Sequence, residues 1–199
     1  MNFGNVKVHD SLNGILAHTM TIEGKKFLKG RIISKEDQEY FIKHNIDNLI
    51  CAKLSKKDIH EDDAANILAK IFNNTTLALE KAFTGRANIL ANKSGLLVID
   101  EDKIHKFNKT SNSITIATLN NNSKVKKGEM IATIKIIPFS IEKKSVKIIE
   151  KLNFKKSLFI HPFKDQKCAL LLTHLNKENI KLNYISEKKI KDRLEKLNC

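Results

Sequence analysis

Apolar and polar residues alternate with a helical period in the segment after residue 34. Ser34 followed by Asp37 is typical of a helix N-cap with an acidic third position, and Tyr40 and Phe41 continue the apolar face towards Asn45. The run NLICAKL at 48–54 then has the length and apolar content of a strand. The pattern therefore predicts a helix packed on a strand, preceded by short strands and turns around the glycines of residues 11–33.

A second helix is predicted from Glu61, where three acidic residues favour the start of a helix, through Leu68 and Phe72 to about Asn73. The following LALEKAF (77–83) is interpreted as another helical piece. From Gly95 the period changes, and GLLVID, SITIATL and MIATIKII predict three strands of a small sheet or barrel, the last of which ends at Pro138.

The C-terminal third has a different pattern. A lysine-rich, partly helical connector is expected after a domain boundary near residue 141, followed by SLFIH, by CALLLTH (168–174) as a buried strand, and by a helix from about Glu187. The predicted fold class is α+β: a mixed helix and strand region with a small sheet or barrel over 1–140, followed by an incomplete α/β unit over 141–199.

Composition narrows the class of protein. The chain has 199 residues, 41% of them hydrophobic, which supplies a core, and a net charge of +14. Lysine is scattered along every segment and only 6% of residues are aromatic, so the sequence favours a solvated lysine surface over a nucleic-acid interface. No apolar stretch is long enough for a membrane span or typical of a secretory signal, and we expect a cytoplasmic protein. Cys51, Cys168 and Cys199 are spaced too widely for a disulfide framework or a CxxC metal site.

Six phrases in order along the chain resemble the N-terminal region of bacterial molybdopterin-binding proteins. They are GILAHT (14–19), KGRIISKED (29–37), DIHEDDAANILA (58–69), AFTGRANILA (82–91), ITIATL (114–119) and ATIKIIPF (132–139). The segment from residue 170 onwards is similar to the first strand and helix of the cofactor-binding domain of that family. The resemblance implies a role in molybdenum-cofactor biosynthesis or binding, with molybdopterin as the cofactor.

The chain departs from this family in its last third. The resemblance implies glycine-rich loops that hold the pterin phosphate at helix N-termini, yet no glycine follows Gly128. No acid, base or nucleophile set emerges from the spacing, so an enzymatic activity stays undecided and an accessory or scaffold role is expected. Two alternatives stay open: a basic nucleic-acid-binding protein, and a structural subunit that pairs with itself or with a partner carrying the rest of the cofactor domain.

The best candidate binding site is the segment TGRAN. Gly85 allows a ligand to approach the backbone, Arg86 offers a planar guanidinium to a phosphate or carboxylate, and Thr84 and Asn88 add polar contacts. We predict an anion site for molybdopterin or a nucleotide-like ligand. In the alternative interpretation, Thr84 and Asn88 satisfy local backbone groups while Arg86 pairs with a carboxylate such as Glu61 or Asp62.

The acidic residues Glu61, Asp62 and Asp63, preceded by His60, are weak candidates for a divalent metal such as Mg²⁺. Consecutive residues at a helix start point in different directions, so stabilisation of the helix terminus explains the same residues and no metal site is assigned. His18 and His174 each follow an apolar run and are interpreted as hydrogen-bonded structural residues.

Overall fold

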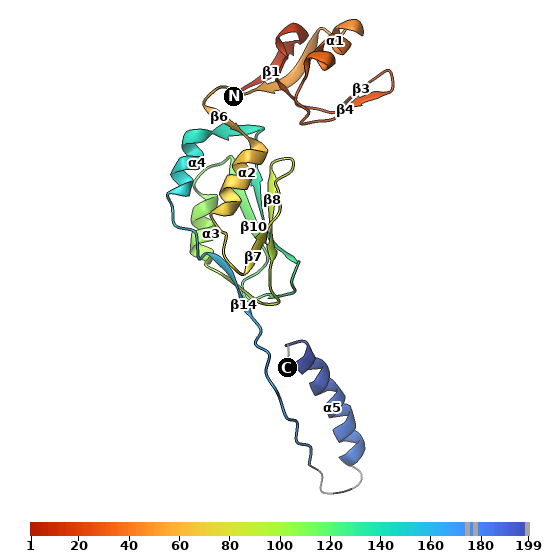
Figure 1. The fold of residues 1–199 in the computed structure, drawn as a ribbon, viewed down its shortest axis with the longest axis vertical. Coiled ribbons are helices and arrows are strands. Elements are labelled where there is room, and N and C mark those ends of the chain that lie inside the picture. The colour runs from red at the N-terminus through yellow and green to blue at the C-terminus, as the bar shows by residue number, and fades with distance from the viewer. Residues whose placement is uncertain (174–175, 177–178, 198–199) are drawn as a thin grey trace.

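The computed structural model describes residues 1–173, 176 and 179–197. Its architecture is α+β with antiparallel strand pairs, which confirms the predicted class. Figure 1 shows three parts in succession: an N-terminal unit with α1 at one end, a larger central body, and an extended segment that leads to α5 at the other end. The two folded parts each have a separate hydrophobic core.

The N-terminal unit is a three-stranded sheet of order β1-β5-β2 with a β3-β4 hairpin and one helix beside it. Its elements are β1 (Asn2–Lys7), a 3-10 turn (Val8–Asp10), β2 (Ile15–Leu16), β3 (Met20–Ile22), β4 (Lys25–Phe27), α1 (Lys35–Lys43) and β5 (Asn48–Lys53). Phe27 and Phe41 meet in its core with ring centres 4.7 Å apart. The predicted helix, strand and glycine turns of this region are confirmed.

A capping box fixes the start of α1. The Ser34 hydroxyl accepts a hydrogen bond from the Asp37 N–H, and the Asp37 carboxylate accepts one from the Ser34 N–H. Arg31 donates two further hydrogen bonds to Asp37, at 2.6 and 2.8 Å. Burial alone would raise the pKa of Asp37, but the hydrogen bonds from Arg31 and the Ser34 N–H lower it overall. Arg31, Ser34 and Asp37 of KGRIISKED therefore have a structural role here.

The central body contains three helices and three small sheets. Its elements are β6 (Asp58–His60), α2 (Glu61–Lys70), β7 (Leu77–Leu79), β8 (Arg86–Ala91), β9 (Gly95–Ile99), α3 (Glu101–Asn108), β10 (Ile114–Thr118), β11 (Lys124–Val125), β12 (Met130–Ile136), β13 (Ser140–Glu142), α4 (Lys143–Glu150) and β14 (Leu158–Pro162). The sheets have the orders β10-β12-β8-β7, β11-β9-β14 and β13-β6. In Figure 1, α2, α3 and α4 lie together on one side of the β8 and β10 strands.

One continuous core holds this body together. It extends from Ala64 to Ile160 and includes buried residues of β13, α4 and β14, so the expected boundary near residue 141 falls inside it. Phe72, Phe107 and Phe154 form its aromatic centre, with ring centres 5.3 to 5.9 Å apart. The α4 helix, predicted as a connector, contributes to the core because one of its faces is apolar.

Two predictions in this body need correction. The helical interpretation of 77–83 is wrong: Leu77–Leu79 is a strand that pairs with β8. Alanine, leucine and glutamate are good helix formers, but the hydrogen bonds to a neighbouring strand override that weak preference. The segment TGRAN contains a turn and then the start of β8, and α3 lies between two of the predicted strands, where the pattern predicts no helix.

The C-terminal part also differs from expectation. Residues 163–173 form neither helix nor strand, so the buried strand predicted at CALLLTH is wrong for its described residues, and Leu171 is 87% exposed. No described strand pairs with this segment, and Figure 1 shows that the segment is extended. The last helix, α5 (Asn179–Glu195), begins earlier than Glu187.

Three further findings complete the fold. Among the described residues, no helix has both the length and the apolar character needed to cross a membrane. Cys51 is a buried free thiol of the N-terminal core, where burial raises its pKa, and Cys168 is exposed. His174 and Cys199 lie outside the described residues.

Candidate anion-binding site

A tight turn places the candidate arginine. Thr84 and Gly85 have φ angles of 49° and 71°, and Phe83 and Arg86 on either side exchange both backbone hydrogen bonds, at 2.9 and 3.1 Å. Two positive φ angles in a two-residue hairpin loop are typical of a type I′ turn, in which glycine is favoured. Arg86 therefore stands at the first position of β8, on a rigid strand.

The start of α2 holds this turn in place. The Gly85 N–H donates a 2.7 Å hydrogen bond to Asp62 Oδ1, and the Gly85 carbonyl accepts one of 2.8 Å from the Ile136 N–H. His60 caps the helix by accepting a hydrogen bond from the Asp62 N–H. Asp62 thus positions the turn. The described ranges contain no group of three or more His, Cys, Asp or Glu side chains that could hold a metal ion.

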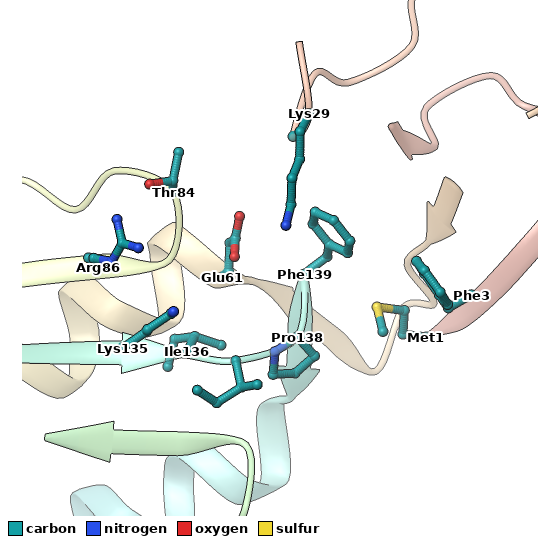
Figure 2. A pocket seen from close by; sticks show the side chains of 12 residues that line it. Met1, Phe3, Lys29, Glu61, Thr84, Arg86, Lys135, Ile136, Pro138 and Phe139 are labelled. Atoms are coloured by element: carbon teal, nitrogen blue, oxygen red, sulfur yellow. The ribbon is translucent and has the colours of Figure 1, made fainter. Parts of the chain in front are cut away.

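A cavity of about 570 Å³ opens beside the turn, between the N-terminal unit and the central body. Its lining combines charged and apolar side chains from both parts: Met1, Phe3, Lys29, Gly30, Glu61, Thr84, Arg86, Lys135, Ile136, Ile137, Pro138 and Phe139. Figure 2 shows Arg86 and Lys135 on adjacent strands, with Glu61 between these strands and Lys29. We call this cavity the inter-unit pocket.

Three cations share the inter-unit pocket. Arg86 lies directly opposite Lys135 in the antiparallel β8–β12 pair, and Lys29 approaches from the N-terminal unit with its Nζ 5.5 Å from the centre of the Phe139 ring. None of the three forms an ion pair with any residue in the described part of the chain. Like charges directly opposite each other on neighbouring strands destabilise a sheet, so an anion bound here would relieve a repulsion.

Glu61 is the one carboxylate that lines the inter-unit pocket within the described part of the chain. Burial raises the pKa of Glu61, and neighbouring Asp62 raises it further, while His60, Lys29 and Lys135 act in the opposite direction. Its backbone N–H donates to the Phe139 carbonyl at 3.0 Å, which fixes the start of α2 against the segment after β12. The site therefore offers one carboxyl group beside three cations.

The remaining wall is apolar and aromatic. The Phe3 and Phe139 rings are nearly parallel, with an interplanar angle of 22° and centres 6.2 Å apart, and Phe3 is 52% exposed. Pro138 continues this wall. A flat ring can pack against such a surface while a charged substituent reaches the cations.

The structure separates the four predicted binding residues. Thr84 and Arg86 line the inter-unit pocket, and Gly85 makes the turn. Asn88 does not line it, because its side-chain amide donates to Glu80 Oε2 at 2.8 Å on the β7 side. The expected alternative, an ion pair between Arg86 and a carboxylate, does not occur among the described residues. His18 is exposed.

An ion pair between Met1, which lines the pocket, and Asp58 connects the N-terminal unit to the central body. The Met1 amine lies 2.7 Å from Asp58 Oδ2, and the same carboxylate accepts a 2.7 Å hydrogen bond from the Ser55 N–H. The hydrogen bond from the amine, followed by that from Ser55, lowers the pKa of Asp58 to about 2. Because the pKa of an aspartate in an unfolded chain is about 3.9, the ionised carboxylate stabilises the fold above that pH.

We expect this stabilisation to disappear as the pH falls from about 4 towards about 2, since both states are then protonated. In urea unfolding at neutral pH, the free energy of unfolding of Asp58→Asn should be lower than that of the parent by about 1 kcal/mol or more. The two free energies should converge in acid. Asp165→Asn, at an exposed position outside helices and strands, is the control and should show no such convergence. A difference for Asp58→Asn that is independent of pH would contradict the assignment.

Comparison with protein-family models identifies no matching family, and no curated protein or solved structure matches the chain. The resemblance to molybdopterin-binding proteins therefore remains a prediction from the six sequence phrases.

Proposed function

We propose that this protein binds a phosphate-bearing ligand of molybdenum-cofactor metabolism in the inter-unit pocket and serves as an accessory or scaffold protein of that pathway. The observation that carries the proposal is the convergence of Lys29, Arg86 and Lys135 without an ion-pair partner in the described structure. Three cations around one cavity favour a ligand with more than one negative charge, such as a phosphate monoester.

The pocket also matches the rest of such a ligand. Arg86 can donate two parallel hydrogen bonds to a phosphate, and the lysines act as point charges. Phe3 and Phe139 provide an apolar wall against which the flat pterin ring of molybdopterin can pack. The choice of molybdopterin over another ring-bearing phosphate rests on the sequence resemblance, and the charge arrangement supports the phosphate.

A binding role fits the chemistry better than catalysis. Among the described residues that line the pocket, Glu61 has the only acidic side chain, and none is a nucleophile paired with a base. The cofactor itself carries the reactive atoms, and the protein would bind and orient it. No step of a reaction is assigned to this chain.

Arg86→Ala tests the proposal. The probe is the fluorescent, phosphate-bearing oxidation product of molybdopterin, measured by anisotropy, together with the same compound after phosphatase treatment. We expect the parent to bind the phosphorylated form more tightly, and Arg86→Ala to weaken that binding by about tenfold or more, because charge-assisted hydrogen bonds contribute about 1.5–3 kcal/mol.

Arg193→Ala is the matched control, since this exposed arginine lies on α5, outside the inter-unit pocket. It removes the same charge and should leave the affinity unchanged. Equal affinity of Arg86→Ala and the parent for the phosphorylated probe would refute the phosphate site. Binding that survives phosphatase treatment unchanged would refute the role of the three cations.

A further inference from the structure

A second concentration of positive charge lies on the central body, apart from the inter-unit pocket. An open groove of about 750 Å³ is lined by Lys57, Lys143, Lys144, Lys147 and Lys151, with Ile148 and Glu142 as its other residues. We call these five lysines the α4 lysine surface. None of them takes part in an ion pair within the described ranges of the chain.

The fold creates this surface from two distant segments. Lys57 precedes β6, whereas the other four lysines belong to α4 or follow it directly, and the β6–β13 pair brings the segments together. Lys143 Nζ donates a 2.9 Å hydrogen bond to the Lys56 carbonyl, which joins them. Lysine that is scattered along the sequence is therefore gathered on one face.

Helix geometry arranges part of the surface as a row. Lys143, Lys147 and Lys151 are four residues apart, which places neighbours on the same side of the helix about 6 Å apart along its axis. Val146 and Ile149 of the same helix are buried in the core, so the lysine row faces outward. A row of regularly spaced cations is complementary to a row of regularly spaced phosphates.

We propose that the α4 lysine surface binds the phosphate backbone of a nucleic acid without reading its sequence. The surface has lysines as point charges, and none of the described residues that line the groove is an arginine or an aromatic residue that could contact base edges or stack on bases. Affinity at such a surface comes from the release of counterions and depends steeply on salt.

A membrane surface and a protein partner fit the α4 lysine surface less well. A helix that lies in a membrane interface inserts an apolar face into the lipid, but the apolar residues of α4 are in the core and Ile148 is the one large apolar residue left outside. Protein interfaces are depleted in lysine and enriched in aromatic residues and arginine, the reverse of this groove. The nucleic-acid backbone is the occupant that matches the lysine row.

The test compares two triple variants of the full chain by fluorescence anisotropy. One carries Lys143→Gln, Lys147→Gln and Lys151→Gln. The control carries Lys26→Gln, Lys106→Gln and Lys109→Gln, which removes the same charge from exposed positions elsewhere. The probes are a labelled DNA duplex of about 20 base pairs and a labelled RNA strand of similar length and mixed sequence, titrated at several salt concentrations.

We expect the parent to bind both probes, with a slope of log K against log salt that becomes shallower by about 2 to 3 in the α4 variant, since each lost phosphate contact contributes about 0.9. Its affinity at about 100 mM salt should fall by at least about tenfold, and the control should lose far less. Binding of only one probe would identify DNA or RNA as the partner.

Equal losses in the two triple variants would overturn the proposal, because they would show that net charge alone attracts the probe. Failure of the parent to bind either probe at low salt would also overturn it. Sedimentation with vesicles of phosphatidylserine and phosphatidylcholine completes the test: vesicle binding that the α4 variant loses, without any nucleic-acid binding, would assign the surface to a membrane. Circular dichroism checks that both variants are folded.

Discussion

Phe72→Ala is expected to destabilise the central body by about 3–5 kcal/mol. Phe72 is fully buried just after the end of α2, and its ring contacts those of Phe107 from α3 and Phe154 from the segment after α4. Alanine would leave a cavity at the place where three segments meet, and the neighbouring rings can refill it only partly. A loss of this size is a large part of the stability of a typical domain.

Denaturant unfolding monitored by circular dichroism measures this effect. Phe83→Ala is the matched control, because the Phe83 side chain is 77% exposed and its removal should change the free energy of unfolding by less than about 0.5 kcal/mol. A change of similar size in the two variants would contradict the position of Phe72 in the core.

The elements that were predicted from sequence are those with strong local signals. Ser34 and Asp37 marked the start of α1, and the acidic residues from Glu61 marked the start of α2. The isoleucine-rich strands β10 and β12 are predicted from composition, and β12 ends at Ile136, shortly before Pro138. In each case the residues that determine the element lie within it or next to it.

The errors occur where distant partners decide the structure. The residues of β7 suit a helix, and only the pairing with β8 makes them a strand. The α3 helix is a different case, because its signal is local: Asp100 caps it, and Ile104 and Phe107 have helical spacing within a region whose composition predicts strands. At CALLLTH the apolar run predicted a strand, although no sheet stands beside it among the described residues.

Only the part of the candidate site that has a local sequence signal could be predicted. Arg86 was identified because glycine precedes it, which is a local signal. Lys135 and Lys29 were not, because their positions depend on the register between β8 and β12 and on the contact between the two folded parts. The same limit concealed the α4 lysine surface, in which Lys57 is separated from the other four lysines by more than eighty residues in the sequence.

Gly85→Ala is expected to affect both stability and the proposed ligand binding. At the Gly85 φ of 71°, a residue with a side chain costs about 1–2 kcal/mol. A Cβ atom there would also lie 2.5 Å from Glu61 Oε2 and 3.0 Å from the Ile136 carbonyl oxygen. The Glu61 carboxylate would have to move, and the turn that positions Arg86 would shift with it.

Gly24→Ala separates these two effects. Glu23 and Gly24 form the corresponding two-residue turn of the β3–β4 hairpin, with φ angles of 45° and 80°, and a Cβ at Gly24 would have no atom within 4 Å. Both variants should lose the same backbone contribution, so any further loss of unfolding free energy in Gly85→Ala measures the contact with Glu61 and Ile136. Only Gly85→Ala should weaken binding of the phosphorylated pterin probe, and equal behaviour of the two variants in both measurements would contradict the position of the turn beside Glu61.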